Sequence, residues 1–133
     1  MKIFLDTNIF LDFALDRGQA DEAEHILNAI ESGQFTAYVA DITLVNIAYV
    51  ARKQKESNKR LLYFITKHFT VIGAENREFE QALALDNRDL EDNVQVVLAE
   101  KTTCQMIITN DLSFPKEKIT VISSVDFVKH YCL

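Results

Sequence analysis

Short apolar runs alternate with longer segments in which apolar residues recur at helical spacing along most of the chain. The first run, Ile3-Phe4-Leu5, is unbroken, which is typical of a strand buried on both faces. Four later segments also have strand character: residues 35–39, 70–72, 106–109 and 120–122. Because helical segments separate most of these strands, the pattern predicts a three-layer α/β fold, with a five-stranded parallel sheet covered by helices on both faces.

The composition favours one compact domain over residues 1–133. With 48% hydrophobic residues, one proline and three glycines, the chain has enough apolar residues for a sizeable core and few loop-forming ones. The three histidines are dispersed, glycine-rich phosphate loops are absent, and the two cysteines lack metal-binding spacing. We therefore expect a cytoplasmic protein without a zinc site, a signal peptide or a membrane-spanning segment. Acidic side chains remain as the candidates for chemistry.

Two of the predicted strands end in polar side chains that suit a cation. Asp6 directly follows the first strand, and Asn110 and Asp111 follow the fourth. In open α/β sheets this edge binds ligands, and two carboxylates placed there can both stay ionised through a cation between them or through generous hydrogen bonding; a hard divalent metal is the simplest candidate. The alternative is structural: Asp6 would cap the helix that follows it, and Asp111 would lie in a solvated turn.

A third acidic segment begins the helix predicted after residue 89. Asp89 and Asp92 have the spacing of a capping box, so capping is the simplest role for Asp89. Asp92 then occupies the third helical position, where the helix holds its carboxylate near the amino end.

The only concentration of basic residues lies between residues 52 and 60. The net charge of -6 argues against binding nucleic acid through the bulk field of the protein. A local cluster can either solvate a helix end or contact a phosphate backbone, and both roles are compatible. Its members are Arg52, Lys53, Lys55, Lys59 and Arg60, opposed only by Glu56.

Three short blocks together resemble the PIN domain, a nuclease fold that includes the VapC-type toxins of toxin-antitoxin pairs. They are FLDTNIFLDF at residues 4–13, DLEDNVQVVLAE at 89–100 and MIITND at 106–111. The resemblance implies the strand order 3-2-1-4-5 and an Mg²⁺- or Mn²⁺-dependent ribonuclease with RNA as substrate. It also implies an antitoxin partner and a homodimer.

Carried over by position, the resemblance implies that Asp6, Asp92 and Asp111 are the catalytic metal ligands. The residues that would support them are Thr7, Asn8, Asn46, Asp89, Thr109 and Asn110, and the basic cluster would hold the RNA backbone.

Asn46 is a departure from the family, which usually has a glutamate in the helix after the second strand. The set of four acids becomes three, which should weaken metal binding unless another acid, such as Asp41, compensates. A catalytically weakened PIN-like module that binds RNA or protein is therefore the alternative function. A phosphatase of the haloacid dehalogenase type also begins with a strand ending in aspartate, but it needs a second aspartate where this chain has Asn8.

Overall fold

The structure is a computed structural model that describes residues 1–53 and 55–132, and only the backbone of residues 55–57. The strands are β1 (Lys2–Leu5), β2 (Thr36–Ala40), β3 (Phe69–Ile72), β4 (Met106–Ile108) and β5 (Thr120–Ile122). The helices are α1 (Thr7–Ala14), α2 (Ala20–Glu31), α3 (Asp41–Val50), α4 (Lys55–His68), α5 (Asn76–Leu83), α6 (Leu90–Lys101) and α7 (Ser124–Tyr131).

The strands form one parallel sheet in the order β3-β2-β1-β4-β5, which confirms the predicted fold class and strand order. β1 lies at the centre, paired with β2 on one side and β4 on the other. Its apolar run is fully buried, since Ile3, Phe4 and Leu5 are each 0% exposed. The central strand is therefore covered on both faces, as its unbroken apolar pattern predicts.

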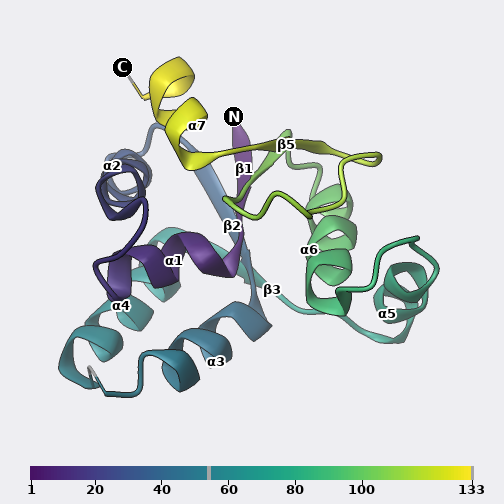
Figure 1. Cartoon of the computed structure of the whole chain (residues 1–133), viewed down its shortest axis with the longest axis horizontal. Helices are drawn as coiled ribbons and strands as arrows, with labels where there is room; N and C mark the ends of the chain where they lie inside the picture. The colour runs from purple at the N-terminus through teal and green to yellow at the C-terminus, as the bar shows by residue number, and fades with distance from the viewer. Residues whose placement is uncertain (54, 133) are drawn as a thin grey trace.

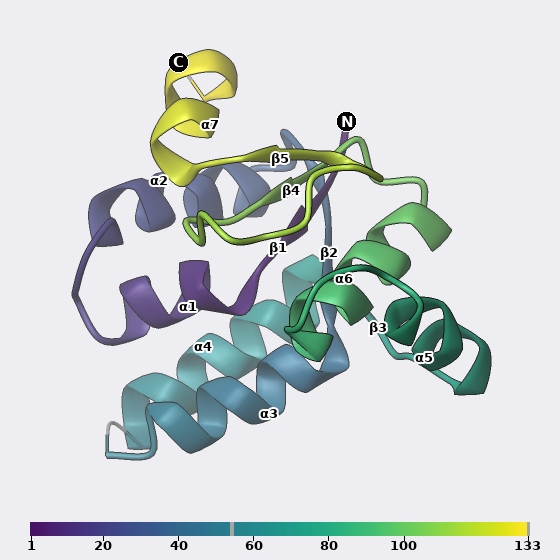
Figure 2. The same cartoon turned by 45° about the vertical axis from the view of Figure 1, so that its right-hand side comes forward.

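Helices cover both faces of the sheet (Figures 1 and 2), and their buried side chains form two apolar cores, one on each face. Ile3 and Leu5 of β1 pack with residues of α1, α2, α3, α4 and α7, including Ile26, Ile47 and Phe127. Phe4 points to the other face and packs with α5 and α6. α6 is the most enclosed helix, because every residue from Asp92 to Ala99 is buried.

Side-chain caps fix the starts of three helices at positions that the sequence marks. Asp6 caps α1, Asp89 caps α6 through a 3.1 Å hydrogen bond from the Asp92 backbone N–H, and Ser123 caps α7. The capping role predicted for Asp89 is thus present.

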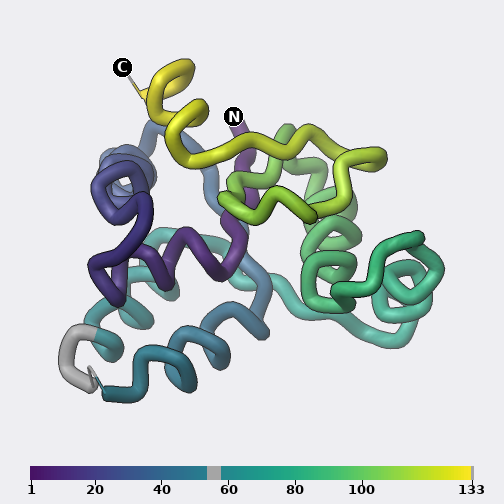
Figure 3. The backbone as a smooth tube through the Cα atoms, in the orientation of Figure 1, coloured from purple at the N-terminus to yellow at the C-terminus, as the bar shows by residue number. Residues whose placement is uncertain are grey.

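The carboxyl ends of β1 and β4 meet at the point where the strand order reverses. Leu5 pairs with Ile108, and the backbone N–H of Asp6 donates to the carbonyl of Ile108 at 3.1 Å. The next residues of both strands, beginning with Asp6 and Thr109, therefore lie side by side at a topological switch point. Both ends of the chain lie far from this edge, at the top of Figure 3, whereas α3 lies at the bottom.

Candidate active site

A pocket of about 400 Å³ opens at this edge of the sheet, between the starts of α1 and α6, the middle of α3 and the segment after β4. It contains all three acids that the sequence singles out, Asp6, Asp92 and Asp111, although they are separated by up to 105 positions. The remaining lining residues are Thr7, Asn8, Leu11, Asn46, Val50, Asp89 and Glu91.

Asp6 is held rigidly at the base of this pocket. Its Oδ1 accepts hydrogen bonds from the backbone N–H of Thr7 at 2.7 Å and from Nε2 of Gln95 at 2.8 Å. Its Oδ2 accepts from the hydroxyl of Thr109 at 2.6 Å. Burial raises the pKa of the Asp6 carboxyl, and these three donors oppose that rise because they favour the ionised form. Asp6 is therefore both the cap of α1 and a member of the pocket.

Of the two buried acids that line the pocket, Asp6 and Asp92, Asp92 is the one whose carboxyl oxygens have fewer hydrogen-bond partners among the described residues. Its side chain is only 5% exposed, and no described residue hydrogen-bonds to its Oδ2. Burial, followed by the charges of Asp6, Asp89 and Asp111, raises the pKa of Asp92 to about 8. The first turn of α6 thus presents one carboxyl oxygen, Oδ2 of Asp92, that lacks a hydrogen-bond partner in the described part of the chain, while a side-chain hydrogen bond with Asp111 adds to the raised pKa of Asp92.

Asp111 lies at the open side of the pocket and is oriented by its own turn. Its Oδ1 accepts from the backbone N–H of Ser113 at 2.9 Å and from the Ser113 hydroxyl at 2.8 Å. These bonds lower the pKa of Asp111, so this carboxylate is the one most easily kept ionised. The turn predicted as the structural alternative is present, and it directs the carboxylate into the pocket lining.

Three of the predicted supporting residues connect the acids to the fold. Thr109 is buried and bridges two of them, since its hydroxyl donates to Asp6 and accepts from the backbone N–H of Asp111 at 3.1 Å. Thr7 donates to Oε2 of Glu91 at 2.9 Å. Asn8 lines the pocket and makes a long contact of 3.5 Å from its Nδ2 to the Thr109 hydroxyl.

Asn110 does not line the pocket. Its Oδ1 accepts from the backbone N–H and the hydroxyl of Ser124, both at 3.0 Å, so it joins the end of β4 to the start of α7. Asp41 also lies elsewhere: it is exposed, its Oδ1 accepts from the backbone N–H of Ile42, and its carboxylate lies against Gly73 at the end of β3. Asp41 therefore does not line the pocket that contains Asn46, and it does not replace the acid that position 46 lacks.

Two residues of the site escape sequence analysis, Glu91 and Gln95. Glu91 accepts hydrogen bonds from Thr7 and, at 3.0 Å, from Nδ2 of Asn46, which links α6 to α3 across the pocket. Gln95 is 0% exposed and donates to Asp6. A signal for Gln95 exists in retrospect, because it follows Asp92 by three positions and so lies on the same face of a helix. Glu91 gives no such signal, since its partner is 45 positions away.

The basic cluster begins close to the pocket. Arg52 follows the pocket residue Val50 by two positions, donates from Nη1 to the carbonyl of Tyr49 at 2.9 Å and lies over the Tyr49 ring. Lys53 and Lys59 are exposed, and Arg60 borders a second pocket beside Phe64. The side chain of Lys55 lies outside the described residues. Because consecutive Cα atoms are 3.8 Å apart, Lys53 begins within about 11 Å of Val50.

The charges of the pocket suit a divalent cation. Five carboxylates line it, those of Asp6, Asp89, Glu91, Asp92 and Asp111, and none takes part in an ion pair among the described residues. Carboxylate and amide oxygens are the ligands of Mg²⁺ and Mn²⁺, and the unpartnered Oδ2 of Asp92 offers one directly. As the side chains lie, no three acidic, histidine or cysteine groups in the described part of the chain already converge on one point. The chemistry of the donors fits such an ion; hydroxyls and amides engage the oxygens of Asp6 and Glu91, whereas Oδ2 of Asp92 has no hydrogen-bond partner among the described residues.

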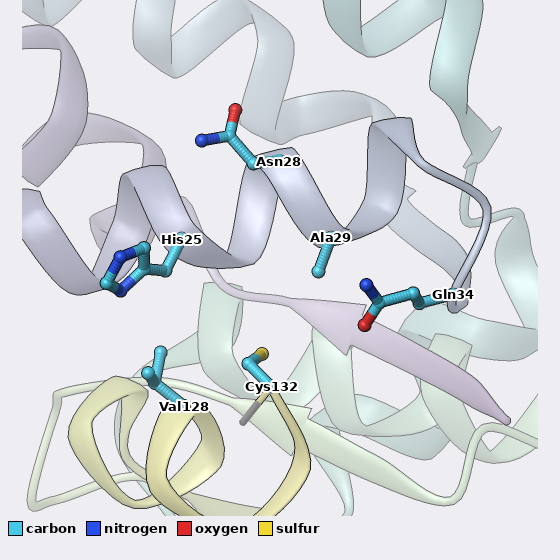
Figure 4. A pocket seen from close by; sticks show the side chains of 6 residues that line it. All are labelled: His25, Asn28, Ala29, Gln34, Val128 and Cys132. Atoms are coloured by element: carbon cyan, nitrogen blue, oxygen red, sulfur yellow. The ribbon is translucent and has the colours of Figure 1, made fainter.

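Another pocket lies between α2 and α7 and differs in chemistry (Figure 4). It is lined by His25, Asn28, Ala29, Gln34, Val128 and Cys132, without a carboxylate. The two cysteines are free. Within the described residues, no helix combines the length and the apolar character needed to cross a bilayer.

The fold and the pocket define an α/β protein with an acidic site at the switch point of a parallel sheet. The sequence profile of the PIN domain matches residues 2–113, so the chain belongs to the PIN domain family. The resemblance noted in the sequence is thereby confirmed.

Characterised proteins of similar sequence and fold span nearly the whole chain. Ribonuclease VapC1 of Aquifex aeolicus is 26% identical over 137 aligned residues, covering 98% of this chain and 95% of the relative. The VapBC2 structure of Rickettsia felis, bound to a promoter DNA fragment, is similar with a TM-score of 0.70 at 17% identity, covering 92% of this chain and 98% of the other. A toxin-antitoxin complex from Klebsiella pneumoniae gives a TM-score of 0.69 at 21% identity, with 92% and 97% covered. At these identities the structures establish the fold alone.

Proposed function

We propose that residues 1–133 form a single PIN-domain ribonuclease that hydrolyses RNA phosphodiester bonds with Mg²⁺ or Mn²⁺. The observation that carries the proposal is the carboxylate cluster that lines the pocket at the switch point: two of its five acids, Asp6 and Asp92, are buried, and none of the five has a cationic partner in the described part of the chain. The likeness to Ribonuclease VapC1 across 98% of the chain supports RNA as the substrate. The cytoplasmic location expected from the sequence is part of this proposal.

The three acids would bind the metal from different sides of the pocket. Asp6, fixed by three donors, and Asp92, with one free oxygen, would hold the ion at the closed end of the pocket. Asp111, oriented by Ser113, would complete the coordination from the open side. When bound, Mg²⁺ or Mn²⁺ supplies an activated water and offsets negative charge on the scissile phosphate. Asn8 lines the same pocket and can donate to a phosphate oxygen.

Cleavage of RNA in the presence and absence of metal tests this function. We expect the purified protein to cut a mixed-sequence RNA with Mn²⁺ or Mg²⁺, to stop when EDTA is added in excess, and to resume when metal is restored. Release of phosphate from a small monoester, without RNA cleavage, would instead indicate a phosphatase. Binding of RNA without cleavage under all metal conditions would favour the weakened binding module.

The basic cluster should contribute to RNA affinity through phosphate contacts. Replacing Lys53 and Lys59 by glutamine should weaken binding and reduce the slope of log affinity against log salt by about 1.4, since each lost contact to a single strand contributes about 0.7. Fluorescence anisotropy at several salt concentrations measures this slope. The matched control replaces Lys67 and Lys129, which are exposed on α4 and α7 outside the cluster. Equal slopes for the two double variants would place the RNA-binding surface elsewhere.

We also propose that the protein is the toxin of a toxin-antitoxin pair. The Klebsiella structure, which is a toxin-antitoxin complex, and the Rickettsia VapBC2 structure support this role through their shared fold. α3 and α4 expose large apolar side chains suited to a protein partner, namely Val45 at 69%, Tyr49 at 68% and Tyr63 at 66%. Val45 and Tyr49 are one helical turn apart and therefore share a face of α3. The predicted homodimer stays a prediction.

A further inference from the structure

Asn46 and Glu91 form a contact that bears directly on the acid missing from α3. Nδ2 of Asn46 donates to Oε2 of Glu91 at 3.0 Å, and the hydroxyl of Thr7 donates to the same oxygen at 2.9 Å. Thr7 in turn bonds to the hydroxyl of Thr43 at 2.8 Å. The carboxylate of Glu91 thus reaches from α6 to the side chain at position 46, where the family pattern has a carboxylate of its own.

We infer that Glu91 is the fourth acid of the metal site and supplies from α6 the charge that Asn46 does not supply from α3. Asn46 becomes a positioning residue that keeps the Glu91 carboxylate on the α3 side of the pocket. The inference rests on the proposed metal-dependent function and concerns residues that the family pattern does not assign.

The surroundings of Glu91 support a role beyond joining two helices. Its partners are neutral donors, an amide and a hydroxyl, so its negative charge is not offset by any ion pair among the described residues. It lines the same pocket as Asp92, whose buried Oδ2 lacks a hydrogen bond there. If Glu91 served only to join α6 to α3, it would not need a negative charge, because a glutamine would accept the same two hydrogen bonds.

Substitution of Glu91 by glutamine separates its charge from its hydrogen bonds. The amide oxygen of Glu91→Gln can still accept from Asn46 and Thr7, so we expect the metal-free protein to melt at or above the parental temperature. Calorimetric titration with Mn²⁺ alone, without RNA, should show affinity reduced by about tenfold. The control is Glu100→Gln, the same change at an exposed position near the other end of α6, which should leave the Mn²⁺ affinity unchanged.

A second variant places the carboxylate at position 46 of α3, where the family pattern has it, instead of at position 91 of α6. Asn46→Glu alone would put two carboxylates in contact, so we expect the metal-free protein to melt at a lower temperature. Combined with Glu91→Gln, the same substitution should restore Mn²⁺ affinity to within about threefold of the parent, because the pocket regains its charge and a carboxylate–amide contact. If Glu91 serves packing alone, the double variant should not regain Mn²⁺ affinity.

The outcomes distinguish this inference from the proposed function. A parent that binds Mn²⁺, with Glu91→Gln binding equally tightly, would overturn the role of Glu91 and leave the metal site intact. Failure of the double variant to regain affinity would also overturn it, because position 46 and position 91 would then not be interchangeable sources of charge. A parent that binds no Mn²⁺ would overturn both the inference and the proposed function.

Discussion

Replacing Asp6 by asparagine should reduce metal-dependent RNA cleavage by at least about 100-fold while leaving the fold intact. The loss is expected because Asp6 is the acid most firmly positioned for a cation, with all three of its donors fixed by the fold. An amide at this position cannot supply the negative charge that would hold the metal. Initial rates on a mixed-sequence RNA with Mn²⁺ measure the effect, and calorimetry with Mn²⁺ alone shows whether metal binding is lost with them.

The environment of Asp6 explains why the fold should tolerate this change. The oxygen of Asp6→Asn can still accept from Thr7 and Gln95, and its Nδ2 can donate to the Thr109 hydroxyl, which turns to accept. Burial already disfavours the charged form, since it raises the pKa of Asp6, so a neutral side chain costs little. We expect the melting temperature without metal to be equal to or above that of the parent.

Asp12→Asn is the matched control for this experiment. Asp12 lies on α1 outside the acidic pocket, and its Oδ1 is 3.6 Å from Nε of Arg17. Its substitution should leave cleavage within about twofold of the parent, because Asp12 does not line the pocket and an amide oxygen at this position can still accept the long 3.5 Å contact from Nδ2 of Asn110. If Asp6→Asn cleaves RNA at the parental rate, the pocket is not the active site. If it melts far below the parent, Asp6 is chiefly a structural cap.

The sequence predicts the position of Asp6, Asp92 and Asp111 because each follows from a local signal. A buried strand that stops at a polar residue gives Asp6 and the segment ending at Asp111, and the capping pattern places Asp92 in the first turn of α6. Parallel strands then bring their carboxyl ends to one edge, so local signals suffice to place Asp6 and Asp111 together, whereas the expectation that Asp92 joins them rests on the resemblance to the PIN domain. The observed strand order confirms that β1 and β4 are neighbours.

The contacts of Glu91 and Gln95 could not be predicted in the same way. Glu91 is one acid among several at a helix start, and only packing of α3 against α6 shows that its carboxylate meets Asn46 rather than solvent. Gln95 is a polar residue that a helical pattern would place on the surface, whereas α6 is enclosed on all sides and buries it against Asp6. Tertiary burial of polar side chains overrides the periodic pattern at these positions, as is common where a site is built.

Asp92 should make the stability of the metal-free protein fall as pH rises. Its pKa is raised from 3.8 to about 8, so between these values the folded protein retains a proton that the unfolded chain has released. Stability therefore decreases from about pH 4 upward, and the full penalty is present above about pH 8. Asp6 acts in the same direction because its pKa is also raised, whereas the lowered pKa of Asp111 affects only the acidic range.

Asp92→Asn should remove this loss of stability at high pH, because asparagine carries no proton to release. At pH 4 this penalty has hardly begun, because Asp92 is largely protonated in the folded protein and only about half ionised in the unfolded chain, so the two proteins should melt at similar temperatures in EDTA. At pH 8.5 the variant should melt higher by about 5 °C or more, because it has no charge to bury beside Asp6, Asp89 and Asp111. Circular dichroism melts at both pH values measure the difference, and Mn²⁺ titration of the same samples should show weaker binding by the variant.

Asp126→Asn provides a closely matched control. Asp126 occupies the third position of α7, and its backbone N–H donates to the capping hydroxyl of Ser123 at 3.1 Å, just as that of Asp92 donates to Asp89. Unlike Asp92, Asp126 is exposed, so its substitution should change the melting temperature by less than about 2 °C at either pH. A pH-dependent gain confined to Asp92→Asn would tie the effect to the pocket. If Asp92→Asn instead melts at the same temperature as the parent at pH 8.5, ionisation of Asp92 does not destabilise the fold. The repulsion between carboxylates that argues for a bound cation is then not present in solution.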